Sequence, residues 1–152
     1  MITVLLVDDD EDCRLMMREA MQDGNLKHEV HEVSCGEEAL DFVFRRGKYR
    51  TAPTPGLIYL DIDMPGLSGI DVLKEIRAHE EFKTIPVVIM TNLDDDREKT
   101  LAAQYGANSY TIKPNDPLQF IQTVIEATNY WTHVHQRPGE GETAPEGTDR
   151  PA

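Results

Sequence analysis

Residues 56–69 read GLIYLDIDMPGLSG, and this segment predicts how the rest of the chain is arranged. The apolar run Leu57–Leu60 is too short for a helix and too apolar for a surface strand, so it predicts a buried strand. Asp61 and Asp63 follow it, and the Pro-Gly pair after them ends the extended backbone in a turn. Ligands of open parallel sheets bind at the carboxyl ends of the strands, so Asp61 is a candidate for chemistry.

Four further strands are predicted, and helical patterns separate them along the chain. The strands cover residues 2–7, 29–34, 86–90 and 108–112, and the helices cover residues 13–21, 36–44, 70–76, 94–105 and 118–133. Such alternation predicts an α/β fold in which helices cover both faces of a five-stranded parallel sheet. Right-handed crossover connections then place the carboxyl ends of all strands at one edge.

The composition predicts one acidic domain followed by a tail. The chain has 152 residues, of which 39% are hydrophobic and 28% charged, enough for a hydrophobic core. Its net charge of −13 would repel nucleic-acid phosphates, so no nucleic-acid partner is expected. Residues 138–152 hold four acidic residues and one arginine among Pro, Gly and Thr. We therefore predict a domain over residues 1–135 and a disordered acidic tail over residues 136–152.

The cysteines and the N-terminal residues indicate the cellular compartment. Cys13 and Cys35 have no spacing that is typical of a metal or redox motif. The first residues do not combine a basic region with a long apolar stretch, which disfavours a signal peptide and a membrane span. We expect a reduced, cytoplasmic protein that has no membrane partner.

Polar residues follow four of the predicted strands. If the strands that begin at residues 2, 57, 86 and 108 lie side by side, their ends bring together Asp8, Asp9, Asp61, Thr91 and Lys113. Carboxylates about 4 Å apart repel by about 4 kcal/mol per pair at an effective dielectric constant near 20, so the cluster calls for a counter-ion. An oxygen-only site with open positions suits Mg²⁺. Lys113 and Thr91 would bind a phosphoryl group, and Asp61 would be its nucleophilic acceptor.

Four motifs in order carry a resemblance to a known family. They are VLLVDDD at residues 4–10, YLDIDMPGLSG at 59–69, VVIMTN at 87–92 and GANSYTIKP at 106–114. Over about residues 2–132 the chain resembles the response-regulator receiver domains of two-component signalling. The resemblance implies a flavodoxin-like fold with strand order 2-1-3-4-5. It also implies a stand-alone regulator, not an enzyme, that accepts a phosphoryl group from a sensor histidine kinase onto Asp61.

The resemblance assigns roles to the residues at the strand ends. It implies an Mg²⁺ site whose ligands are the carboxylates of Asp9 and Asp61, the backbone carbonyl of Asp63 and, through water, Asp8. These ligands all lie at the ends of the first and third predicted strands.

Further roles are implied at the fourth and fifth strands. Thr91 and Lys113 contact the phosphoryl group, and Tyr110 is a switch aromatic that turns inward when Thr91 moves toward it. The peptide bond from Lys113 to Pro114 is expected to be cis. Asn92 departs from the family, which usually has a small residue there, and this bears on the lifetime of the phosphoryl group.

Three other segments are similar to single-domain regulators that pair with bacterial phytochrome kinases. They are RRGKYRTAPTP at residues 45–55, EFKTIPVV at 81–88 and NYWTHV at 129–134. This likeness implies a phytochrome kinase as the partner and a role in light signalling. No DNA-binding or catalytic pattern follows Lys113, so the output is expected to be a contact with an unknown downstream protein.

Two alternatives remain open. A haloacid-dehalogenase-type, Mg²⁺-dependent phosphatase also uses an Asp-x-Asp pair, as Asp61 and Asp63 are spaced, but that class places the pair near its N-terminus and follows it with Thr or Val. Here Met64 and Pro65 follow. Turnover of a phosphoester in solution would favour the phosphatase. The second alternative, a receiver used only for interaction, is disfavoured because all five site residues are present.

The last predicted helix carries an apolar stripe that predicts a homodimer. Its members recur at intervals of four and three residues, the spacing of a coiled-coil seam, and they are Phe120, Val124, Ala127, Trp131 and Val134. A large aromatic residue near the end of a chain is a typical interface anchor. The alternative is that the stripe is the core face of an amphipathic helix.

Overall fold

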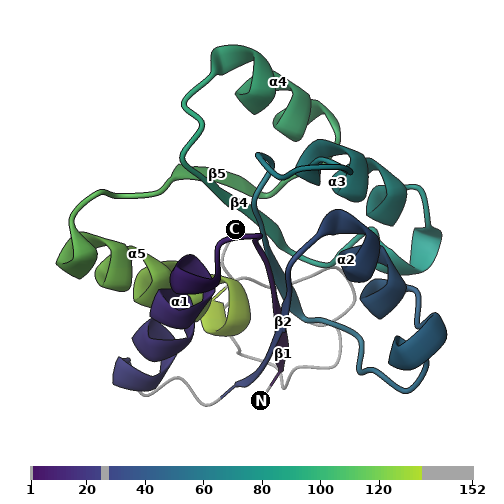
Figure 1. Ribbon diagram of the computed structural model, residues 1–152, viewed down its shortest axis with the longest axis horizontal. Coiled ribbons are helices and arrows are strands. Elements are labelled where there is room, and N and C mark those ends of the chain that lie inside the picture. The colour runs from purple at the N-terminus through teal and green to yellow at the C-terminus, as the bar shows by residue number, and fades with distance from the viewer. Residues whose placement is uncertain (1, 25–27, 135–152) are drawn as a thin grey trace, which may run out of the picture.

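Five parallel strands form one sheet in the order β2-β1-β3-β4-β5 (Figure 1). They are β1 (Thr3–Val7), β2 (Glu29–Val33), β3 (Leu57–Leu60), β4 (Val87–Thr91) and β5 (Ser109–Ile112). The computed structural model describes residues 2–24 and 28–134, and of residue 134 only the backbone. The fold class and the strand order expected from the sequence are confirmed.

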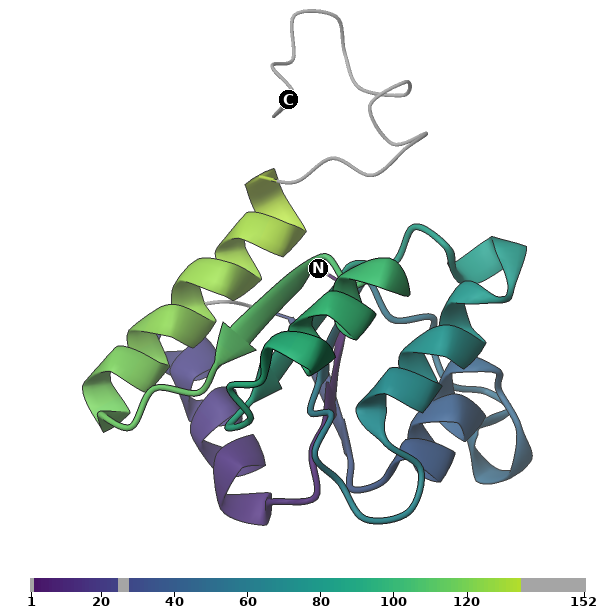
Figure 2. The ribbon, with the colours of Figure 1, turned by 90° about the horizontal axis from the view of Figure 1, so that it is seen from above.

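Helices cover both faces of the sheet. On one side lie α1 (Glu11–Asp23) and α5 (Pro117–Asn129), and on the other lie α2 (Gly36–Val43), α3 (Gly69–Arg77) and α4 (Asp96–Gln104) (Figure 2). Each face has its own hydrophobic cluster. Short turns complete the described elements: the 3₁₀ helices η1 (Gly47–Tyr49) and η2 (Glu80–Phe82), and the π-helical turn η3 (Tyr130–Val134) that continues α5.

The central strands are apolar on both sides because helices cover both sides. All four residues of β3 are buried, and Leu60 at its end lies in register with Val7 of β1 and Ile89 of β4. Parallel sheets covered on two faces require such continuous apolar strands. The carboxyl ends of β1 and β3 are thus at the same level, where Asp61 begins the next loop, and β4 continues two residues further, to Thr91.

The helix ends follow local capping signals. α4 begins at Asp96, two residues later than predicted, because the Asp95 side chain accepts hydrogen bonds from the amides of Arg97 and Glu98. A carboxylate in this position satisfies amide groups that have no partner within the helix.

The apolar stripe of α5 faces the sheet. Phe120 is 4% exposed and Val124 is completely buried, in the cluster formed with α1 and the central strands. Ala127 and Trp131 pack partly against the same cluster, and the side chain of Val134 lies outside the description. The prediction of a dimer seam is therefore wrong for Phe120 and Val124. Helical periodicity marks a buried face, but it does not say whether a sheet or a second chain buries it.

A polar contact fixes α5 on this face. The hydroxyls of Tyr59, on β3, and Thr128, on α5, are 2.6 Å apart, and both residues are buried. Burial raises the pKa of Tyr59. A buried hydroxyl pair of this kind satisfies both groups and so favours one position of the helix along the strand.

The predicted tail, residues 136–152, lies outside the residues that the structure describes. The tail and the domain boundary near residue 135 therefore stay predictions.

In the ranges 2–24 and 28–134, every helix is too short or too polar to cross a bilayer.

Gly69 lets α3 start directly against the strand end that carries Asp61. Its amide is 3.3 Å from the carbonyl oxygen of Ile62. A Cβ atom at this position would lie 2.3 Å from the carbonyl oxygen of Asp61 and 2.6 Å from the Cα of Ile62. Both neighbours are backbone atoms, so they cannot rotate away.

Gly69→Ala is therefore expected to displace α3 and to lower the free energy of unfolding by about 1 to 3 kcal/mol, the usual range for overpacking. Urea denaturation measures this change. Gly47→Asn is the matched control, because Gly47 has a φ of 58°, which Asn tolerates, and open space around it. Equal stability of Gly69→Ala and the wild type would contradict the close contact.

Candidate functional site

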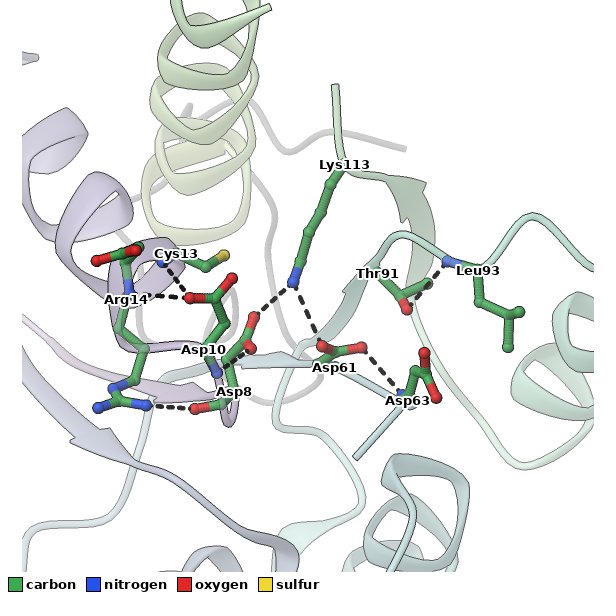
Figure 3. Close-up of polar contacts among 10 residues, drawn as sticks. Asp8, Asp10, Cys13, Arg14, Asp61, Asp63, Thr91, Leu93 and Lys113 are labelled. Atoms are coloured by element: carbon green, nitrogen blue, oxygen red, sulfur yellow. Dashed lines mark hydrogen bonds and ion pairs between the residues drawn. The ribbon is translucent and has the colours of Figure 1, made fainter. Parts of the chain in front are cut away.

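Residues from four strand ends meet at the carboxyl edge of the sheet (Figure 3). Asp8 follows β1, Asp61 follows β3, Thr91 ends β4 and Lys113 follows β5, and all four are buried. Asp9, beside Asp8, is exposed. Polar side chains are rarely buried unless other groups pair with them, so their contacts identify what the site is built to hold.

Lys113 connects two of the carboxylates. Its Nζ atom lies 2.7 Å from Oδ2 of Asp8 and 3.3 Å from Oδ2 of Asp61. Burial opposes the charge on Lys113, but its hydrogen bond to Asp8 and the charges of Asp8 and Asp61 outweigh this effect and raise the pKa of the ammonium. Lys113 therefore stays charged at neutral pH.

The peptide bond after Lys113 is trans, so the prediction of a cis bond to Pro114 is wrong. The trans form is the more stable one for a prolyl bond by about 0.5 to 1 kcal/mol. From this backbone the ammonium already reaches both Asp8 and Asp61.

Three carboxylates share this corner of the sheet. Oxygen atoms of Asp8, Asp9 and Asp61 all lie within 4.8 Å of one another. Burial raises the pKa of Asp8, and the charge of Asp61 raises it further, against the opposing effects of Lys113 and the Asp10 amide. One ammonium does not balance three carboxylates. The donor set, made only of oxygen, therefore fits a divalent cation of the Mg²⁺ or Mn²⁺ type.

The Asp61 side chain is held on both oxygens. Lys113 contacts Oδ2, and the backbone amide of Asp63 donates to Oδ1 at 3.0 Å. The side chain of Asp63 is exposed. Asp63 thus contacts Asp61 through its backbone amide and not through its side chain. The metal-binding role of its backbone carbonyl stays a prediction.

Thr91 and Tyr110 are connected through the backbone of Leu93. The Thr91 hydroxyl accepts a hydrogen bond from the Leu93 amide at 3.3 Å, and the Tyr110 hydroxyl donates to the Leu93 carbonyl at 2.6 Å. Burial, and to a smaller extent the negative charges of nearby acidic residues, raises the pKa of Tyr110 to about 12. Tyr110 therefore remains a hydrogen-bond donor at neutral pH.

The loop between β1 and α1 contains contacts that the sequence analysis did not find. The Asp10 amide donates to Oδ1 of Asp8 at 2.9 Å, and the Asp10 side chain caps α1. Arg14 donates from Nη1 to the carbonyl oxygen of Asp8 at 2.6 Å. An aspartate before a helical pattern is a recognised start signal and could have revealed the cap. A bond from Arg14 to a backbone carbonyl leaves no such pattern.

Cys13 is a buried neighbour of the same loop. It is 6% exposed, and burial together with the charge of Asp8 raises the pKa of its thiol to about 12. The thiol is thus protonated at neutral pH and packs as a small apolar group.

The response regulator receiver domain pattern matches residues 4–125. This chain belongs to the response regulator receiver family. The prediction of a receiver is confirmed, and receivers are signalling proteins. The match includes every strand end of the site described above.

Two curated response regulators or regulatory proteins are similar to this receiver over most of their length. The response regulator Rcp1 of Synechocystis sp. is 27% identical over 135 residues, which cover 89% of this chain and 92% of Rcp1. A probable methanogenesis regulatory protein, FilR2 of Methanothrix harundinacea, is 29% identical and covers 90% of this chain, over 87% of FilR2.

Solved structures of response regulators superpose closely on this chain. The phosphorylated cyanobacterial phytochrome response regulator RcpA superposes with a TM-score of 0.86 at 28% identity, over 90% of this chain and 98% of RcpA. The Mn²⁺-bound form of Rcp1 superposes with a TM-score of 0.85 at 26% identity, over 91% of this chain and 99% of that chain. A relative of this receiver therefore binds a divalent cation.

Lys113→Met is expected to lower the free energy of unfolding by about 3 kcal/mol in the presence of a chelator, because it leaves Asp8 and Asp61 buried without their ammonium. The deficit should shrink as pH falls, since protonation of Asp8, whose pKa burial already raises, removes the repulsion. Urea denaturation from pH 7 toward acid measures both effects.

Lys99→Met is the control, because Lys99 pairs with Asp94 and Asp96 at the surface. Surface ion pairs contribute little to stability, so its stability should not change. A Lys113→Met protein as stable as the wild type at neutral pH would contradict the charge-balancing role of Lys113.

Proposed function

We propose that this receiver accepts a phosphoryl group from a sensor histidine kinase onto Asp61 and signals through contacts with a downstream protein. The observation that carries the proposal is the buried pairing of Asp61 with Lys113, beside the carboxylates of Asp8 and Asp9. A carboxylate held at a rigid strand end is positioned for attack, and the ammonium beside it can compensate the charge of an arriving phosphoryl group.

The transfer is a displacement at phosphorus. A carboxylate oxygen of Asp61 forms a bond to the phosphorus atom of the kinase phosphohistidine, while the bond from phosphorus to the imidazole nitrogen breaks and its electron pair returns to the ring. Lys113 shifts its hydrogen bond from Asp61 to a phosphoryl oxygen. Thr91, whose hydroxyl is an acceptor for Leu93, still has its own proton to donate to the phosphoryl group.

We further propose that the cation is Mg²⁺, held by the carboxylates of Asp9 and Asp61, by the backbone carbonyl of Asp63 and, through water, by Asp8. The cluster of three carboxylates and the Mn²⁺ bound by Rcp1 support a divalent site. When bound, the cation supplies charge neutralisation for the transferring phosphoryl oxygens. The residues supply the position: Asp61 faces Lys113 on one side and the Asp63 amide on the other.

A switch through Thr91 and Tyr110 is supported by their shared contact. If Thr91 turns toward a phosphoryl group on Asp61, its acceptor role for the Leu93 amide is lost. The Leu93 carbonyl, which holds the Tyr110 hydroxyl, is then free to move with its segment. We propose that this releases Tyr110 to turn inward and so reports phosphorylation to the surface of β5 and α4.

The receiver is favoured over the two alternative functions. Membership of the receiver family accounts for all four motifs, whereas a dehalogenase-type phosphatase accounts only for the Asp-x-Asp pair. The assembled cluster of Asp8, Asp61 and Lys113 supports phosphorylation over a role in interaction alone. We expect a single, self-limited phosphorylation and no catalytic turnover of phosphoesters.

Asp61→Asn should abolish labelling by acetyl phosphate and Mg²⁺, because the amide lacks the nucleophilic oxygen. Phosphate-affinity electrophoresis and mass spectrometry would measure the acyl phosphate and its position. Asp63→Asn is the matched control: it changes a neighbouring exposed carboxylate but keeps the backbone groups, so labelling should persist. An acyl phosphate on another residue, or sustained hydrolysis of p-nitrophenyl phosphate, would refute the proposal.

We propose a bacterial phytochrome kinase as the phosphodonor. The support is similarity to RcpA, which is named as a phytochrome response regulator. FilR2, named for methanogenesis, is as similar in sequence, so the pairing must be measured. Phosphotransfer from purified kinases should be faster from a phytochrome kinase than from unrelated kinases. Faster transfer from an unrelated kinase would refute this pairing while leaving Asp61 as the acceptor.

A further inference from the structure

We propose that Arg14 is a positioning residue, which holds the peptide between Asp8 and Asp9 in the orientation that the divalent cation requires. This inference rests on the proposed cation site. It goes beyond that site because Arg14 does not supply a ligand and carries the same sign of charge as the cation.

The contact is made to the backbone rather than to a carboxylate. Nη1 of Arg14 donates to the carbonyl oxygen of Asp8 (Figure 3), and the two atoms are 2.6 Å apart. That oxygen belongs to the same planar peptide unit as the amide nitrogen of Asp9. Fixing the oxygen therefore fixes the plane from which the Asp9 side chain extends, and the Asp9 carboxylate is one of the three in the cluster.

The other polar groups of Asp8 already have partners. Its amide donates to the carbonyl oxygen of Val33 at 3.3 Å, and its carboxylate accepts from the Asp10 amide and from Lys113. Among the described contacts, only Arg14 holds the carbonyl side of Asp8. Since Asp9 is exposed, packing does little to fix its carboxylate, and the backbone before it has to provide the orientation.

Arg14 is itself held in place from β2. Its Nε atom donates to Oε1 of Glu32 at 3.0 Å, and its side chain is only 13% exposed. The other carboxylate oxygen of Glu32 accepts from Arg18, whose side chain is 41% exposed. A planar guanidinium that makes bonds in two directions has a defined orientation, which a lysine ammonium does not provide.

Charge and geometry predict opposite results when Arg14 is replaced. If Arg14 acted only through its charge, removing it would leave the acidic cluster more negative and would tighten cation binding. If Arg14 acts by holding the peptide, its removal frees Asp9 and weakens cation binding. Groups that orient metal ligands typically change metal affinity by about 10-fold to 100-fold when they are removed.

The experiment is a titration of the purified full chain with Mg²⁺ alone. Isothermal titration calorimetry measures the dissociation constant, and the rise in melting temperature gives an independent measure of binding. For Arg14→Gln we expect a dissociation constant roughly 10-fold higher than in the wild type. Arg14→Lys, which keeps the charge but not the fork, should also bind more weakly. Arg18→Gln is the matched control, because it removes an arginine from Glu32 without touching Asp8, and its affinity should stay unchanged.

Asp9→Ala removes one of the proposed cation ligands, so it shows the Mg²⁺ response that is expected when the site is lost. Comparison of the wild type with Arg14→Gln then separates the cation site from the role of Arg14. No Mg²⁺ response in the wild type would overturn the cation site itself. A wild type that responds, with Arg14→Gln binding equally well or more tightly, would overturn only the role of Arg14.

If Arg14→Gln does not fold, Arg14→Lys provides the test. It keeps the positive charge but loses the planar guanidinium that bonds Asp8 and Glu32, so it should reduce Mg²⁺ affinity, and an unchanged affinity would count against the inference. Circular dichroism in the presence of a chelator shows whether each variant is folded.

Discussion

The ammonium of Lys113 between Asp8 and Asp61 is the interaction on which the site depends. It places one buried positive charge among three carboxylates, which would otherwise repel one another at the end of a rigid sheet. The ammonium balances only part of this charge. In the proposed function, the uncompensated negative charge favours a bound divalent cation, and the cation in turn compensates the charge of a phosphoryl group on Asp61.

Parallel strands with aligned ends bring these charges together, and the surrounding loops hold them there. Gly69 lets α3 begin against the Asp61 backbone, and Asp10 caps α1 while its amide holds Asp8. Most of these contacts are backbone hydrogen bonds or close backbone approaches. They fix the direction of each carboxylate to a degree that flexible side chains on a surface would not achieve.

Two series of hydrogen bonds connect the site with the two edges of the sheet. One runs from Thr91 through the Leu93 backbone to Tyr110, at the edge formed by β5. The other runs from the loop after β1 through Arg14 to Glu32 of β2, at the opposite edge of the sheet. In the first, a hydroxyl can exchange one partner for another. In the second, a guanidinium bonded on two sides resists movement, so we regard it as a fixed support.

The sequence by itself determined the five strands, their buried character and the carboxylates at their ends, because burial and turn formation depend on neighbouring residues. It also determined the family, since four motifs in order specify it. It did not determine the partner of the α5 stripe, because an apolar face packs equally well on a sheet or on a second chain, and only the tertiary structure places Phe120 and Val124 in the core. It did not reveal Arg14 either. A backbone carbonyl is present at every residue, so only the fold decides which one a distant guanidinium meets.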